Sequence, residues 1–275
     1  MTTKLQFNAF QLKIIALIIM TIDHLGFYQT LTANPQINSI FRIIGRIAAP
    51  IFLFLVTEAL HHTRSKTKYL IRLYIAAVIT GTLNALFFNT IAIGYSTSAL
   101  GNIFITFFYV AFYIYFIEIL LQSKNNKTKI YSLIALLIPI LAIFLNIKFC
   151  TTTYQQIIHI LFPSPLTINY SILFVLIGIV WYFTNNKATN CVILAITSIF
   201  SFLIPDTAIP HNTEFFQLHT LFINPQWCMF LAIPFILIYN GEKGKSLKSF
   251  FYIYYPLHQY YLFLIYLLTH TKGTP

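Results

Sequence analysis

The chain alternates between long apolar runs and short polar stretches, at a spacing typical of membrane helices. A helix needs about 20 mostly apolar residues to cross a bilayer. We count nine such runs; the seventh and eighth are short, so eight to ten spans fit the pattern. No internal repeat or long linker separates them, which predicts one all-α domain over 1–275, a polytopic transmembrane helix bundle. The predicted spans are 12–30, 40–60, 69–88, 102–122, 129–148, 166–184, 188–204, 225–240 and 249–268.

Composition narrows the class of protein further. Only 8% of the residues are Asp, Glu, Lys or Arg and 58% are hydrophobic, whereas a soluble domain carries about 25% charged residues. A soluble enzyme, a disordered chain and a disulfide scaffold are all excluded by these values. The net charge of +11 does not indicate nucleic-acid binding, because the basic residues form short clusters between apolar runs. We expect the lipid bilayer to be the surroundings of this chain.

The basic residues also predict which way the spans face. Lys and Arg are enriched in cytoplasmic loops. With nine spans, thirteen of the seventeen basic residues fall on the side of the N-terminus. The N-terminus is therefore expected in the cytoplasm, in a multi-pass protein of the plasma or inner membrane. The thirteen are Lys4, Lys13, Arg64, Lys66, Lys68, Arg72, Lys124, Lys127, Lys129, Lys187, Lys243, Lys245 and Lys248.

The first predicted span carries two ionisable residues on one face. Lys13 and His24 are eleven residues apart, which leaves them about 20° apart around a helix axis and roughly 16 Å apart along it. Ionisable groups inside a membrane are costly and are candidates for a functional site. The alternative is that Lys13 reaches the inner headgroups and His24 lies in the outer interface. Spacing alone leaves both interpretations open.

The second predicted span contributes Arg46, in the segment IIGRIAAP. Arg42 is expected at the interface, while Arg46 lies deeper, among small residues that allow helices to approach closely. Arg46 is thus expected to face the bundle. It could instead serve as a structural partner for Asp23, or for backbone carbonyls that Pro50 leaves without a donor.

Four further polar residues are secondary site candidates. Glu58 belongs to the second span, and Asn84 and Asn240 lie at membrane depth or at helix ends, where interhelical hydrogen bonding is the default. His258 follows Pro256 in the last span, among tyrosines typical of an interface. Its residue context favours a hydrogen-bonded structural histidine.

Both ends of the chain resemble a known family. The order KIIALIIMTIDHLG, FRIIGRIAAPIFLFLVTEALHHT and KYLIRLYIAA resembles the TraX family of membrane proteins. The closing segments MFLAIPFILIYNGEKG and FFYIYYPLHQYYLFLI are similar to that family's final motif, which keeps His258 among the candidates. The segment INYSILF departs from the family, because Asn169 stands where an acid is more usual.

The resemblance implies acyl transfer. The TraX family is associated with acetylation of the N-terminus of conjugative pilin, and it is similar to integral-membrane acyltransferases with a basic residue, ten intervening residues and a catalytic histidine in the first helix. Lys13 and His24 match that spacing. Acetyl-CoA is then the expected co-substrate, and a surface protein or glycan the expected acceptor.

Residue chemistry suggests roles within such a site. Acyl transfer needs a base for the acceptor and positive groups for the developing oxyanion. His24 is the candidate base, because a neutral imidazole accepts a proton. Asp23 is a second catalytic candidate, but it points about 100° away from His24 and could pair with Arg46 or another helix instead. Arg46, the third catalytic candidate, is assigned to electrostatic stabilisation or substrate positioning. Lys13 and two loop residues, Arg64 and Arg72, are the candidate contacts for CoA phosphates.

Two other classes of protein remain open at this point. A transporter or flippase would also place rare charges within a bundle, although paired inverted repeats are not visible. A non-catalytic assembly factor for a surface appendage would not require the face shared by Lys13 and His24. No motif for a metal site appears, and the sequence distinguishes neither the acceptor, nor N- from O-acylation, nor acetyl from longer acyl groups.

Overall fold

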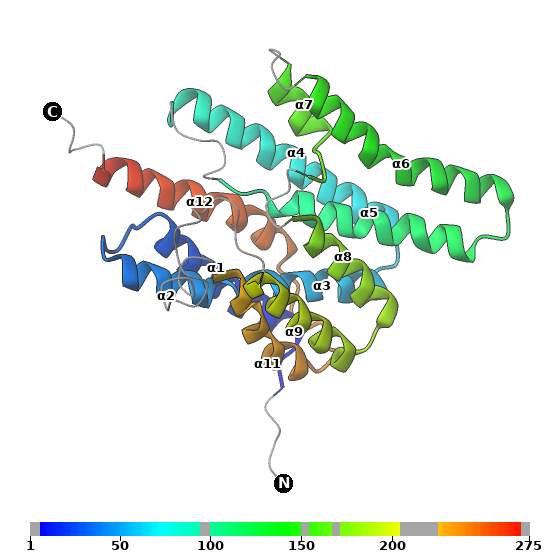
Figure 1. The fold of residues 1–275 in the computed structure, drawn as a ribbon, viewed down its shortest axis with the longest axis horizontal. Helices are drawn as coiled ribbons and strands as arrows, with labels where there is room; N and C mark the ends of the chain where they lie inside the picture. The colour runs from blue at the N-terminus through cyan, green and yellow to red at the C-terminus, as the bar shows by residue number, and fades with distance from the viewer. Residues whose placement is uncertain (1–5, 94–99, 150–153, 167–170, 204–224, 271–275) are drawn as a thin grey trace, which may run out of the picture. The chain divides into compact units, whose positions relative to one another are not determined.

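The computed structural model describes residues 6–93, 100–149, 154–166, 171–203 and 225–270 (Figure 1). Within these ranges every regular element is a helix, apart from an isolated β-bridge between Phe7 and Tyr239. The all-α prediction is confirmed for the described part of the chain. The helices are α1 (Ala9–Phe27), α2 (Pro35–Gly45), α3 (Ala48–His62), α4 (Lys66–Thr90), α5 (Ile103–Gln122), α6 (Asn126–Lys148), α7 (Gln155–Leu161), α8 (Ser171–Thr184), α9 (Lys187–Leu203), the 3-10 helix η2 (Pro225–Ala232), α11 (Ile233–Leu237) and α12 (Lys248–His270).

The helices identify a membrane protein. Among the described residues, five helical stretches are long and apolar enough to cross a bilayer: α1, α2 together with α3, α4, α5 and α6. Three shorter apolar helices follow, at Ile172–Thr184, Lys187–Leu203 and Pro225–Leu237. Helix α12 has the length but is rich in tyrosine, which makes it less apolar. Each predicted span contains a helix, while the number of crossings and the side of the N-terminus stay predictions.

The second predicted span is interrupted by a turn. Helix α2 ends at Gly45 and α3 begins at Ala48, with a turn at Arg46 and Ile47 between them. Pro50 explains the interruption, because proline has no N–H to donate to the carbonyl four residues earlier, which is that of Arg46. Pro50 itself lies in the first turn of α3, where its missing N–H is tolerated. The break places Arg46 at a helix end.

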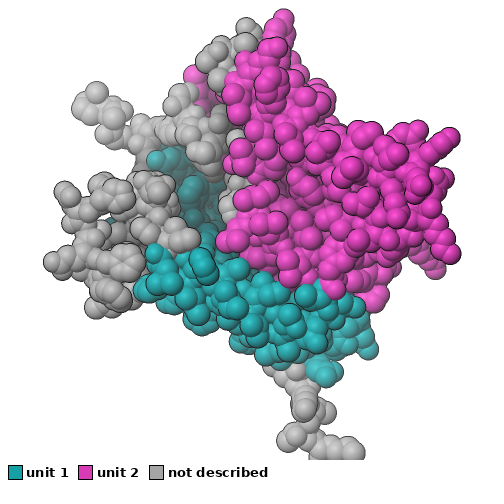
Figure 2. Space-filling view, turned by 45° about the vertical axis from the view of Figure 1, so that its right-hand side comes forward, with its two compact units in different colours: residues 1–55, 184–275 teal, residues 56–183 magenta. Residues whose placement is uncertain are grey.

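The chain divides into two compact units, shown in different colours in Figure 2. Unit 1 comprises 1–55 and 184–275, and unit 2 comprises 56–183. Unit 1 therefore joins the first helices of the chain to the last ones, and α3 contributes to both units.

Unit 1 ties the start of α1 to the segment between α11 and α12. The backbone of Phe7 donates to the carbonyl of Ile238 (3.0 Å) and accepts from the N–H of Asn240 (2.9 Å). The N–H of Ala9 donates to the carbonyl of Glu242 (2.8 Å). Asn8 then caps α1 in a reciprocal pair with Gln11, so the first backbone groups of α1 are satisfied.

Unit 2 is held together by polar side chains on several helices. The ammonium group of Lys66 on α4 lies 2.5 Å from a carboxylate oxygen of Glu118 on α5 and 2.5 Å from the hydroxyl of Tyr182 on α8. The Tyr182 hydroxyl donates to the other Glu118 oxygen at 2.9 Å. The ring of His61 stacks on Tyr182, with centroids 4.1 Å apart. We call these four residues the Lys66 cluster; they join α3, α4, α5 and α8.

Candidate functional site

The candidate site of unit 1 depends on a close approach between α1 and α2. A Cβ atom on Gly26 would lie 2.7 Å from the backbone oxygen of Asn38 and 2.7 Å from Cβ of Phe41. A Cβ atom on Gly45 would overlap the side chain of Asp23. Glycine at both positions therefore lets α2 pass directly beside the C-terminal half of α1, where Asp23 and His24 lie.

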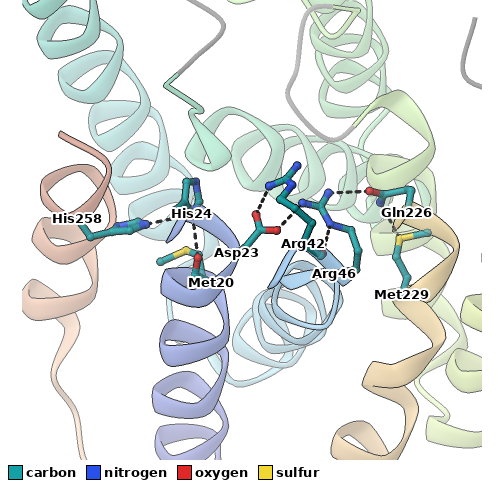
Figure 3. A network of polar contacts seen from close by, with 8 residues as sticks. All are labelled: Met20, Asp23, His24, Arg42, Arg46, Gln226, Met229 and His258. Atoms are coloured by element: carbon teal, nitrogen blue, oxygen red, sulfur yellow. Dashed lines mark hydrogen bonds and ion pairs between the residues drawn. The ribbon is translucent and has the colours of Figure 1, made fainter. Parts of the chain in front are cut away.

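Asp23 binds two arginines from α2 and the turn that follows it. Its Oδ2 accepts from Nη1 of Arg42 at 2.7 Å, and its Oδ1 accepts from Nη2 of Arg46 at 2.8 Å. Asp23 is buried, and both distances are typical of charge-assisted hydrogen bonds. The arginines are four residues apart, which places them on the same face of one helical turn. In Figure 3, dashed lines join the carboxylate to both guanidinium groups.

The arginines have further contacts that fix their positions. Nη1 of Arg46 donates to Oε1 of Gln226 at 3.0 Å, and its Nε donates to the carbonyl of Arg42 at 3.3 Å. The guanidinium of Arg42 lies over the ring of Phe27, 4.9 Å from its centroid. Two guanidinium groups and one carboxylate give this trio a net charge of one positive. The trio thus provides a fixed positive field at the end of α1.

His24 points away from Asp23, toward α12 (Figure 3). Its Nδ1 lies 2.9 Å from the carbonyl oxygen of Met20 and 3.4 Å from Nε2 of His258. The two imidazole rings are nearly perpendicular, with centroids 4.8 Å apart. Nδ1 of His258 in turn lies 3.0 Å from the carbonyl oxygen of Tyr254. Two histidines, 234 residues apart in the chain, thus form a pair.

These contacts determine which ring nitrogens carry the protons. A carbonyl oxygen can only accept a hydrogen bond, so Nδ1 must be the protonated nitrogen of both His24 and His258 when the rings are neutral. Nε2 of His258 then directs its lone pair at His24. Nε2 of His24 also carries a lone pair, which makes it the basic nitrogen of the pair.

The structure brings the three predicted catalytic residues into one region. Asp23, His24 and Arg46 lie together, and His258 joins them through His24. The predicted divergence of Asp23 and His24 is observed, since each binds a different neighbouring helix. The pairing of Asp23 with Arg46, considered as an alternative from the sequence, is present.

Lys13 and Asn240 lie near the N-terminal end of α1. The Lys13 ammonium is over the ring of Phe251, 5.8 Å from its centroid. Lys13 and His24 therefore both face α12, as their shared helix face predicted. Asn240 binds the backbone of Phe7 and the carboxylate of Glu242, at the far end of α1 and about 22 Å from the level of His24.

The other candidates belong to unit 2. Arg64 and Arg72 are exposed, and Arg72 lies over the ring of Tyr69. Glu58 is 3.8 Å from the exposed imidazole of His62, while the amide of Asn84 donates to the carbonyl of Leu100 at 3.4 Å. Asn169 lies outside the described residues.

Sequence reasoning missed Arg42 and Gln226 as members of the site. Arg42 was expected at the interface, yet its spacing of four residues from Arg46 is the signal that both reach one carboxylate. Gln226 has no comparable signal, because it lies 180 residues away from Arg46. Within the described ranges, no three His, Cys, Asp or Glu side chains come close enough together to hold a metal ion.

Comparison with known proteins gives a family and two relatives. The family model described as TraX protein matches residues 9–267, across both units. A probable fimbrial assembly protein FimC, serogroup H1, of Dichelobacter nodosus is 37% identical over 79 residues, which are 29% of this chain and 32% of that protein. An uncharacterized protein, RP591, of Rickettsia prowazekii (strain Madrid E) is 27% identical over 240 residues, covering 86% of this chain and 80% of that protein. No solved structure matches the chain significantly.

Proposed function

This chain belongs to the TraX family, and from that premise we propose that it is an integral-membrane acyltransferase. The proposed reaction moves an acetyl group from cytoplasmic acetyl-CoA to an amine or hydroxyl of an acceptor outside the cytoplasm. The N-terminus of a pilin is the acceptor that the family resemblance suggests. The Dichelobacter protein, named for fimbrial assembly, supports an acceptor in a surface appendage.

The contacts of the His24 ring are the observation that carries this proposal. Its Nδ1–H is engaged by the Met20 carbonyl and by His258, which leaves Nε2 as a lone pair on a partly buried ring. A general base requires a neutral imidazole with its acceptor nitrogen directed at the substrate. Free imidazole accepts protons in the physiological range, so His24 is suited to this role.

In the proposed reaction His24 carries the only proton that has to be moved, from the acceptor to the departing CoA thiolate. Nε2 of His24 removes a proton from the acceptor amine or hydroxyl as that nitrogen or oxygen bonds to the acetyl carbon. The carbon–sulfur bond of the thioester then breaks, and the departing CoA thiolate takes the proton back from His24 as CoA–SH. The products are the acetylated acceptor and free CoA, and His24 returns to its neutral form.

The trio of Asp23, Arg42 and Arg46 has an electrostatic role in this scheme. A tetrahedral intermediate carries negative charge on the former carbonyl oxygen, and fixed positive groups stabilise such charge. Arg42 and Arg46 are held by Asp23, so they are preorganised rather than recruited during the reaction. Asp23 therefore acts as the residue that positions them.

Lys13, on the same face of α1 as His24, is proposed to bind a CoA phosphate, while Arg64 and Arg72 of unit 2 stay predictions from the sequence. Lysine ammonium and arginine guanidinium groups are the usual phosphate ligands. Arg64 and Arg72 are exposed, which is suitable for a large, water-soluble cofactor. Removing the Lys13 ammonium should raise the KM for acetyl-CoA and leave kcat unchanged, since the CoA phosphates take no part in the chemistry.

The test is transfer of radiolabelled acetyl from acetyl-CoA in proteoliposomes containing the full chain. Label is followed in an added extract of cell-surface protein, and CoA release is followed with a thiol reagent. We expect transfer by the wild type and its loss in His24→Ala. His62→Ala is the matched control, because the side chain of His62 is exposed and lies in unit 2, outside the unit that holds His24. Equal transfer by wild type and His24→Ala would refute the role of His24.

A second candidate function is a non-catalytic assembly factor, which the name of the Dichelobacter relative favours. Such a protein would need the helix packing around Asp23 but not a basic nitrogen on His24. His24→Gln would then support assembly of the appendage as well as the wild type does. An absence of acetyl transfer by every variant, the wild type included, would put this function ahead of the enzyme.

A further inference from the structure

We propose that His258 is a positioning residue for His24, holding its imidazole in the one tautomer and orientation that acyl transfer can use. This inference rests on the proposed function, because it assigns His258 a task within that reaction. His258 acts through His24 and is not required to touch the substrate. The pair is built from the first and the last described helices of the chain, both in unit 1.

The first argument is that the Met20 carbonyl alone holds His24 incompletely. Met20 precedes His24 by one helical turn, so its carbonyl is also the acceptor for the backbone of α1. A ring bonded only to its own helix can still swing between rotamers. Nε2 of His258 supplies a second acceptor from a different helix, 3.4 Å from the same Nδ1. Two acceptors in two directions restrict both the tautomer and the ring plane.

The second argument is that His258 is itself held on three sides. Its Nδ1–H donates to the Tyr254 carbonyl, the Tyr254 ring stacks on it at 5.3 Å, and the Tyr255 ring contacts its edge at 5.9 Å. His258 is 7% exposed. A side chain so enclosed has little freedom, which is the property that a positioning residue needs.

The third argument is that α1 and α12 are joined beside the histidines. The Thr21 hydroxyl donates to the carbonyl of Leu17 at 2.9 Å, so it must accept from the hydroxyl of Tyr254, which is also 2.9 Å away. Thr21 is three residues before His24, and Tyr254 is four before His258. This contact lies one helical turn from the pair and sets the distance between the helices there.

The test compares His258→Phe with His258→Gln in the acetyl-transfer assay. Phenylalanine keeps an aromatic ring but has no acceptor, whereas the glutamine amide oxygen can stand near the position of Nε2. We expect His258→Phe to lower kcat by about ten- to a hundredfold, which is the size of rate loss that a misplaced catalytic group causes. The KM for acetyl-CoA should be unchanged. His258→Gln should recover most of that loss. Tyr254→Phe controls for disturbed helix contact, because it removes only the Thr21 bond.

Nitrogen NMR of the ¹⁵N-histidine-labelled protein provides a readout that does not need activity. The His24 and His258 signals are identified as those missing from His24→Gln and His258→Gln. We expect a single Nδ1–H tautomer for His24 in the wild type, and a mixture of tautomers in His258→Phe. The inference would be overturned if His258→Phe kept the kcat of the wild type. It would also be overturned if NMR showed that His24 of the wild-type protein carries its proton on Nε2. Absence of transfer by the wild type would overturn the proposed function, and the NMR result would still decide the role of His258.

Discussion

Replacing Asp23 with alanine should severely destabilise unit 1. The change removes two charge-assisted hydrogen bonds, of 2.7 and 2.8 Å, and leaves two guanidinium groups without their carboxylate. The side chains are 10% exposed for Asp23, 27% for Arg42 and 14% for Arg46, so water replaces the lost bonds only in part. Breaking a buried ion pair costs about 3–5 kcal/mol, and we expect the free energy of unfolding to fall by this amount.

The assay is unfolding of the purified protein from mild detergent by increasing SDS, followed by circular dichroism. Asp23→Asn is the matched control: its amide oxygen can still accept one of the two bonds, so its loss should be smaller. The triple variant Asp23→Ala, Arg42→Met and Arg46→Met removes every charge of the trio and should recover much of the stability, because uncompensated charge is the main cost. An Asp23→Ala protein within about 0.5 kcal/mol of the wild type, the size of a neutral surface substitution, would refute this reasoning.

Three more predictions follow from the geometry. Gly45→Ala should destabilise unit 1 by about 1–3 kcal/mol, the usual cost of overpacking, because the new Cβ overlaps Asp23; an unchanged SDS midpoint would contradict this. Glu118→Ala should cost about 3 kcal/mol or more, since it leaves the partly buried Lys66 ammonium without its carboxylate; a loss below about 0.5 kcal/mol in the same assay, the size of a neutral surface substitution, would contradict this. A green fluorescent protein fused to the N-terminus should fluoresce and an alkaline phosphatase fused there should be inactive, as expected for a cytoplasmic end; the opposite pair of results would reverse the predicted orientation.

Hydropathy located a helix in every predicted span, but it predicted neither the interruption of the second span nor the short helix α7, which lies between two spans. Every predicted span contains a helix, because long apolar segments in a membrane must satisfy their backbone groups internally. The break at Arg46 and Ile47 was not predicted, although Pro50 signals a carbonyl without its donor four residues earlier. A helical break within a continuous apolar run leaves the mean hydropathy unchanged. The proline was therefore the signal from which this break could have been predicted.

The sequence predicted which side chains share a helix face, but the one partner that it offered across helices was Arg46 for Asp23, and only as an alternative. The shared face of Lys13 and His24 follows from an angle of 100° per residue, and both residues do face α12. The contact between His24 and His258 depends on which helices pack together, and the periodicity of either helix alone does not contain that information. The same holds for Lys66 and Glu118, which lie 52 residues apart.

The distance in sequence between His24 and His258 has a consequence for biosynthesis. A chain inserted from its N-terminus places His24 in the membrane long before the ribosome has made His258, 234 residues later. Asp23 needs to wait for only about 20 residues, since Arg42 and Arg46 follow on the next helix. The ionic part of the site can therefore form early, during translation, whereas the histidine pair forms only when α12 has been inserted. A nascent or truncated chain lacking α12 would carry the acid and its arginines in place but hold an unpositioned His24, so the geometry proposed for acyl transfer is reached only by the completed protein.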